Sequence, residues 1–154
     1  NSDQAHITNL TYENITLEDG QMLGDDRDDG ENDFLIDFTI AYSVDWTKSA
    51  GIRGSVDGVK IKNVKVYQML DGIVSRMIGE GEQSMIRDVT IEGLEIKGQQ
   101  IENAEQLQLL SNQYVSGLKF LKMDRVNGRH FKLPYKLKLA SSDVNIVTLF
   151  SVAH

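Results

Sequence analysis

The stretch HITNLTYENITLEDG, residues 6–20, decides the fold, because its apolar residues follow neither a helical period nor one continuous alternation. The apolar side chains stand at relative positions 0, 3, 5, 8 and 10, namely at Ile7, Leu10, Tyr12, Ile15 and Leu17. Two short runs alternate at period two, which places the apolar members of each run on one face of a β-sheet. The phase shifts between the runs. The stretch therefore predicts two short strands that meet at a corner.

The same spacing recurs along the chain. VDGVKIKNVKV at residues 56–66 and IRDVTIEGLEI at residues 86–96 match it at every apolar position. Fainter copies begin at Val115 and Val144, so the successive steps from Val56 onward are 30, 29 and 29 residues, and a degraded copy begins at Leu35. A sustained period of this length predicts similar units that stack on one another.

Turn-forming residues occupy two fixed places in the repeat. Relative position 2 holds Asn9, Gly58, Asp88 and Gly117, and relative position 7 holds Asn14, Asn63 and Gly93. These residue types tolerate the left-handed backbone that a tight corner needs. We therefore expect an all-β fold, a parallel β-helix (solenoid) of about six coils with the apolar positions inside. A β-sandwich is the alternative, but it predicts hairpins and gives no reason for the period.

Composition narrows the class of protein. With 154 residues and 40% hydrophobic content, we expect a single domain over residues 1–154. Sixteen basic and 23 acidic residues give a formal net charge of −7, which disfavours nucleic acid and anionic membrane surfaces as partners. No apolar run reaches the roughly 18 residues of a membrane span. The absence of cysteine excludes disulfides and thiolate metal sites but leaves a cytoplasmic location open.

The loop at residues 20–34 is strongly acidic, with Arg27 as its only basic residue. One interpretation is that two of its carboxyl groups act as general acid and base, because glycosidic bond hydrolysis needs one carboxyl group to protonate the leaving oxygen and another to activate water. A calcium site at residues 25–33 is a second interpretation, although the loop does not fit the EF-hand template. A solvated acidic loop without a site is the third.

The segment YSVDWTKSAGIRG, residues 42–54, contains the only tryptophan of the chain. Trp46 stands beside Asp45, Lys48 and Arg53, and we name these four as candidate ligand-binding residues. An aromatic ring can stack on the apolar face of a sugar while polar neighbours bond its hydroxyl groups. The alternative is that Trp46 only covers the core beneath this loop. The three histidines have no metal-ligand spacing, and no metal site is expected from them.

Several phrases of the chain resemble the later coils of polygalacturonase-like and dextranase-type glycoside hydrolases. They are ITNLTYENITLEDG, GIRGSVDGVKIKNVKVYQ and MIRDVTIEGLEIKGQQIENAEQ. The resemblance implies a right-handed parallel β-helix, a polysaccharide lying in a groove along one side, and hydrolysis with inversion by clustered aspartates. Asp25 and Asp26, which follow Gly24, resemble the aspartate pair of active polygalacturonases, and this resemblance makes them our candidate catalytic residues. The Asn-Thr-Asp, Gly-His-Gly and Arg-x-Lys motifs of those enzymes do not occur.

These observations lead to two hypotheses about function. The first is a carbohydrate-active domain, polysaccharide-binding and glycoside-hydrolase-like, which implies a secreted, periplasmic or cell-surface location. The second is a non-catalytic structural or adhesive β-helix of a surface or secreted protein. In both, we expect the chain to be a C-terminal portion of a larger protein, in which upstream coils or a second copy cover the exposed strand edge.

Overall fold

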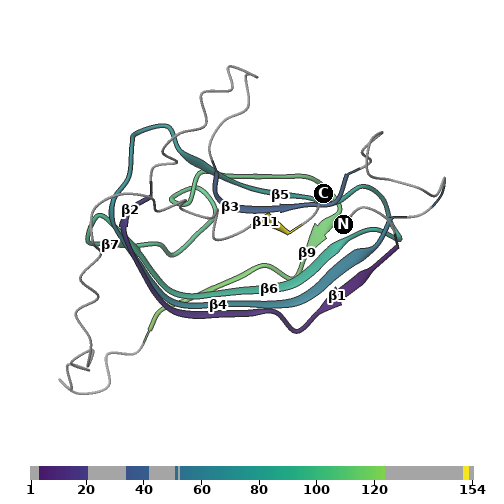
Figure 1. The fold of residues 1–154 in the computed structure, drawn as a ribbon, viewed down its shortest axis with the longest axis horizontal. Coiled ribbons are helices and arrows are strands. Elements are labelled where there is room, and N and C mark those ends of the chain that lie inside the picture. Colours follow the sequence, from purple (N-terminus) through teal and green to yellow (C-terminus); the bar gives the residue numbers. More distant parts are fainter. Residues whose placement is uncertain (1–3, 21–33, 42–50, 52, 124–150, 153–154) are drawn as a thin grey trace, which may run out of the picture.

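The computed structural model describes residues 4–20, 34–41, 51, 53–123 and 151–152 of the chain. All regular elements within these ranges are strands, and they lie in two facing layers (Figure 1). Sheet A has the order β1 (His6–Thr8), β4 (Ser55–Gln68), β6 (Ile86–Ile96) and β10 (Lys119–Leu121); β2 (Thr11–Asp19) also pairs with β4, and β7 (Gln99–Gln100) and β9 (Val115–Ser116) with β6. Sheet B has the order β11 (Ser151–Val152), β3 (Phe34–Thr39), β5 (Val74–Ile78) and β8 (Leu109–Ser111).

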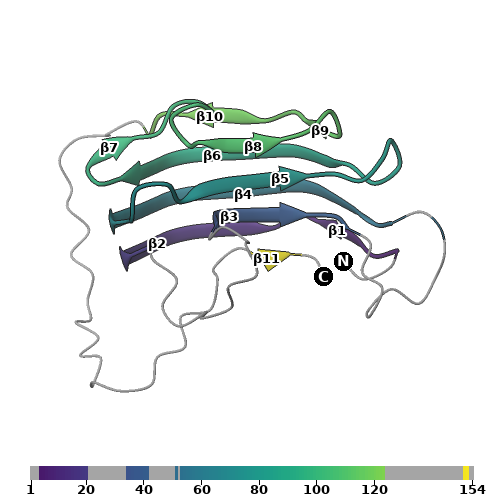
Figure 2. The same ribbon diagram turned by 90° about the horizontal axis from the view of Figure 1, so that it is seen from above.

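The repeated motif stacks on itself in sheet A. β4 and β6 pair in parallel, with Val56 opposite Ile86 and Val66 opposite Ile96. β1 pairs with the start of β4 in the same direction, with Ile7 opposite Val56. Figure 2 shows these strands lying side by side. The prediction that equivalent positions of the copies are neighbours is confirmed for the copies at residues 7, 56 and 86.

The core lies between the two sheets. Every apolar position of the copies at residues 56–66 and 86–96 is at most 9% exposed. Sheet B contributes Phe38 and Met77, which are fully buried. Tyr12 of β2 packs against Phe38 with ring centroids 6.3 Å apart, so it joins the two layers. Burial of each such side chain stabilises the fold by about 1.5–3 kcal/mol relative to exposure.

The turn residues of the repeat have the backbone that the sequence predicts. All seven have positive φ angles, between 51° and 71°: Asn9, Asn14, Gly58, Asn63, Asp88, Gly93 and Gly117. The expectation of a left-handed backbone at both positions is confirmed. The bends nevertheless occur inside continuous strands, because β4 runs through Gly58 and Asn63 without interruption.

The expected parallel β-helix of about six coils is wrong. Within the described ranges, the hydrogen-bonded ladders form two separate sheets, and neither sheet closes into a solenoid. The copy at Leu35 does not lie between its sequence neighbours, because the copies at Ile7 and Val56 pair directly with each other. The end of the last copy, in β11, pairs with β3 and not with the copy that precedes it.

The reason is that a short 0, 3, 5 spacing does not identify one kind of strand. Leu35, Phe38 and Ile40 have this spacing in sheet B, where the register of β3 against β5 shifts between Phe34 and Asp37. An irregular strand and a bend of the repeat thus leave the same short pattern in the sequence. The β-sandwich alternative does not fit either, since the only antiparallel strand pair among the described elements joins β6 to β7.

The segment between β7 and β8 forms turns. Leu107 N donates to Asn103 O, and Leu109 N donates to Ala104 O. The side chain of Gln106 accepts a 2.7 Å hydrogen bond from Glu102 N, which fixes its position on this turn. In the part of the chain that the structure describes, no helix is long and apolar enough to cross a membrane.

Candidate functional site

Of the candidate site residues from the sequence, the structure describes only Arg53. The others lie outside the described residues: Asp25, Asp26, Asp45, Trp46 and Lys48, together with the candidate calcium loop at residues 25–33. Arg53 lies two residues before the start of β4 and is 4% exposed, and its Nε lies 3.5 Å from Glu80 Oε2. Its carbonyl oxygen accepts a hydrogen bond from Ser84 Oγ. A guanidinium in this position joins β4 to the turn at residues 80–84 and presents little surface to a ligand.

A row of polar residues near Arg53 contains the residue types of a serine hydrolase. His6 Nδ1 lies 2.9 Å from Ser55 Oγ, and Ser55 Oγ donates to Asp57 Oδ2 at 2.9 Å. Arg87 Nε lies 2.9 Å from Asp57 Oδ1. In a catalytic triad the histidine stands between the serine and the aspartate and takes the hydroxyl proton. Here that proton points to the aspartate and Ser55 is 3% exposed, so the row links β1, β4 and β6 and does not form a nucleophile.

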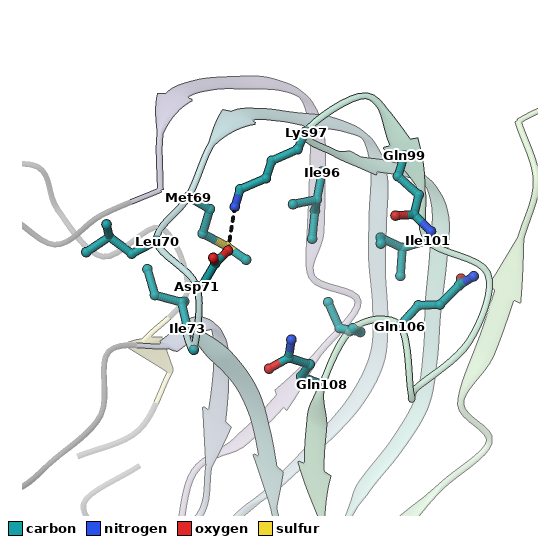
Figure 3. Close-up of a pocket in the computed structure, with 12 residues that line it drawn as sticks. Met69, Leu70, Asp71, Ile73, Ile96, Lys97, Gln99, Ile101, Gln106 and Gln108 are labelled. Atoms are coloured by element: carbon teal, nitrogen blue, oxygen red, sulfur yellow. Dashed lines mark hydrogen bonds and ion pairs between the residues drawn. The ribbon is translucent and has the colours of Figure 1, made fainter.

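A pocket of about 280 Å³ lies at the opposite end of β4 from Arg53 (Figure 3). It is formed where the turn after β4, at residues 69–73, faces the turn after β6, at residues 96–99, and the turn at residues 106–108. Four of its lining side chains are buried and continue the apolar core: Ile73, Ile96, Ile101 and Leu107. The two sheets thus leave a hollow with an apolar wall at this end.

An ion pair lies at the rim of the pocket. Lys97 Nζ donates to Asp71 Oδ1 at 2.8 Å, and Figure 3 shows this contact joining the two turns. The side chain of Lys97 is 46% exposed and that of Asp71 is fully exposed. The hydrogen bond from Lys97, and then its charge, lower the pKa of Asp71. The carboxyl group is therefore ionised at neutral pH, where it accepts hydrogen bonds and has no proton to donate.

Three glutamine side chains complete the polar rim: Gln99, Gln106 and Gln108. Gln99 and Gln106 lie across the pocket from Asp71 in Figure 3. Each amide group offers two donors and an acceptor. The oxygen of Gln106 is used by Glu102 N, which leaves its two donors for other partners. The rim therefore presents donors and acceptors around an apolar wall.

Left-handed backbone positions the rim residues. Lys97 and Gly98 have φ angles of 50° and 80° between the paired residues Ile96 and Gln99, as a two-residue hairpin turn with two positive φ angles requires. Gln108 also has a φ angle of 50°. Lys and Gln are uncommon in this conformation, which costs about 1–3 kcal/mol and is concentrated at functional sites. The turns hold both side chains at the pocket.

The sequence-based prediction missed this site, because residues 97–113 carry no recognisable catalytic or binding motif. The available signals were the Lys97-Gly98 pair, which suits a hairpin turn, and the dense glutamines at residues 99–108. The partner residue Asp71 lies 26 positions away from Lys97. Only the stacking of β4 on β6 brings the two together.

Comparison of the chain with protein-family models, with curated proteins and with solved structures gave no match. Over the described residues, no group of three or more His, Asp or Glu side chains is gathered as metal ligands would be.

Proposed function

We propose that the protein is a carbohydrate-binding domain whose pocket takes one sugar residue of an oligosaccharide or polysaccharide. The observation that carries this proposal is the combination of a buried apolar wall with three amides and an ion pair at an open rim. A sugar ring presents C–H groups on its faces and hydroxyl groups around its edge. Apolar side chains can pack on the C–H groups, and the glutamine amide groups can form hydrogen bonds with the hydroxyl groups.

Binding without hydrolysis fits the pocket best. Among the residues that the structure describes, Asp71 is the only carboxylate that lines the pocket. Hydrolysis of a glycosidic bond needs two carboxyl groups, one of which must hold a proton. Asp71 does not hold one at neutral pH, because the pKa of a carboxyl group is acidic and Lys97 lowers that of Asp71 further.

The charges favour an uncharged glycan. The formal net charge of the chain is −7, which repels polyanions. Lys97, the cation at the rim, is already paired with Asp71. A neutral sugar can bond to the amides without competing for this pair.

A glycan array followed by isothermal titration calorimetry tests the proposal. The double variant Gln99→Ala, Gln108→Ala removes two amides that lie at the surface and should leave the fold intact. Loss of two hydrogen bonds should weaken binding about tenfold. Gln83→Ala, on an exposed turn near Arg53, is the matched control and should bind as the wild type does.

Fluorescence of Trp46, the single tryptophan, separates two locations for the ligand. Quenching that the double variant leaves unchanged would assign binding to the loop with Asp45, Trp46 and Lys48 and would contradict the pocket. An array on which no glycan binds would also contradict the proposal and would favour the structural or adhesive alternative.

A further inference from the structure

An exposed aromatic residue lies next to the pocket. Four large apolar side chains in the described part of the chain are about half exposed: Tyr67 at 58%, Leu70 at 53%, Leu110 at 50% and Leu121 at 48%. Leu70 lines the pocket together with Met69, and Tyr67 lies two residues before Met69 in the sequence. Exposed apolar side chains therefore occur both in the pocket lining and just before it in the sequence.

The register of sheet A places Tyr67 beside the rim. Lys97 N donates to Val66 O at 2.8 Å, so Tyr67 and Lys97 are neighbours across β4 and the end of β6. Val66 is 1% exposed and faces the core, and the alternation of the strand puts Tyr67 on the outer face of sheet A. On its other side, the pairing of Leu17 with Val66 places Glu18 of β2 next to Tyr67.

The ring of Tyr67 thus stands outside the pocket with one charged neighbour on each side. A tyrosine presents a flat apolar face and a hydroxyl group. This combination suits a surface that is exposed to water in the free protein and covered by a ligand in the complex. Its distance along the strand to Met69 is about 7 Å. A single sugar ring in the pocket would leave Tyr67 uncovered, whereas a longer chain would cover both.

We propose that Tyr67 forms a second sugar subsite, so that the ligand is an oligosaccharide chain that runs from the pocket over the Lys97–Asp71 pair onto the tyrosine ring. This inference rests on the proposed function. A second subsite makes the affinity depend on the length of the oligosaccharide, because the second sugar residue gains a stacking contact with Tyr67 that the first sugar residue does not make. Glu18, the neighbour of Tyr67 on β2, accepts hydrogen bonds from the hydroxyl groups of that residue.

The test is calorimetric titration of the whole chain with cello-, isomalto- and xylo-oligosaccharides of increasing length, starting from the monosaccharide. The variants are Tyr67→Ala and Tyr67→Phe, and Leu121→Ala serves as control for loss of an exposed apolar side chain on the outer face of sheet A. Wild type should gain about three- to tenfold in affinity when the chain extends beyond one sugar. Tyr67→Ala should lose this gain but keep the affinity for the monosaccharide, and Tyr67→Phe should retain most of the gain.

The outcomes separate the two proposals. A gain with chain length that persists in Tyr67→Ala overturns the Tyr67 subsite and leaves the pocket as a sugar site. A wild type that binds no member of the three series overturns the proposed function, and the subsite with it. Circular dichroism of each variant shows whether the fold is kept, and the surface position of Tyr67 leads us to expect that it is.

Discussion

The side chain of Asn63 donates a 2.7 Å hydrogen bond to that of Asn14, which occupies the same place in the repeat 49 residues earlier. Both residues have left-handed backbone, with φ angles of 51° and 58°. The two residues therefore provide the left-handed backbone of a bend, and their side chains join β4 to β2. This position combines a local requirement with a long-range contact.

Replacement of Asn63 should separate these two contributions. Asn63→Ala removes the hydrogen bond and places a Cβ without polar compensation in the left-handed region, so we expect a loss of about 1–2 kcal/mol in the free energy of unfolding. Asn63→Gly removes the bond but accepts the backbone, and its loss should be smaller. Urea denaturation measures both. Equal losses for the two variants would show that the backbone conformation contributes nothing.

Gly79 is enclosed, and a Cβ there would meet Tyr114 Cβ at 2.6 Å and Tyr114 O at 2.8 Å. We expect Gly79→Ala to destabilise the protein by about 1–3 kcal/mol, because backbone atoms must shift to make room. Gly81 has no atom within 4 Å of the corresponding position. Gly81→Ala should be neutral or slightly stabilising in thermal melts. A destabilisation of the same size at Gly81 would refute the steric explanation.

Two ion pairs differ in geometry, and we expect them to contribute different amounts to the free energy of unfolding. Arg76 donates from Nε and Nη2 to the two carboxylate oxygens of Asp37, at 3.1 and 2.6 Å, and its guanidinium lies 3.9 Å from the centre of the Phe34 ring. Lys62 reaches Glu92 only at 3.5 Å, with its side chain 49% exposed.

We therefore expect Arg76→Ala to lower the free energy of unfolding by about 1.5–3 kcal/mol. Lys62→Ala should lower it by about 0.5 kcal/mol or less, since exposed pairs contribute little. Denaturation of both variants at low and high salt measures the two losses in the free energy of unfolding. If both variants lost the same stability, the two-point geometry of the Arg76 pair would have no energetic role.

The pKa of Asp71 is lowered by the hydrogen bond and then by the charge of Lys97. A carboxyl group whose pKa is lower in the folded than in the unfolded state adds stability above its unfolded pKa, and this stability is lost as the pH falls through the folded value. We expect Lys97→Gln to return the pKa of Asp71 to its ordinary range. Titration of the carboxyl carbon by NMR measures it. High salt should act in the same direction, because the pair is at the surface.

The fold was predictable where a sequence pattern recurred at a regular period and its residue types had a physical reason to stand there. The apolar positions of residues 56–66 and 86–96 are buried, and the turn residues have positive φ angles. Failure came where only a short spacing was available, at Leu35, since a strand in either sheet produces the same alternation. Closure into a coil depends on how the segments between the strands connect the two sheets, which no side-chain pattern encodes.

The candidate site was less predictable for a related reason. Asp71 and Lys97 belong to different turns and meet only through the stacking of β4 on β6. No known catalytic or binding motif combines an aspartate and a lysine at this separation in the sequence. Arg53 did have polar neighbours in the sequence, but its burial at 4% exposure follows from packing that those neighbours do not reveal.

We propose above all that a neutral sugar binds in the pocket between the turns after β4 and β6. The most direct test is a ¹⁵N NMR titration that follows the side-chain amide signals of Gln99, Gln106 and Gln108 as an oligosaccharide from the array is added. We predict saturable shifts of these signals, with the amide of Gln83 unchanged. Shifts confined to other residues, or no shift at saturating sugar, would contradict the account.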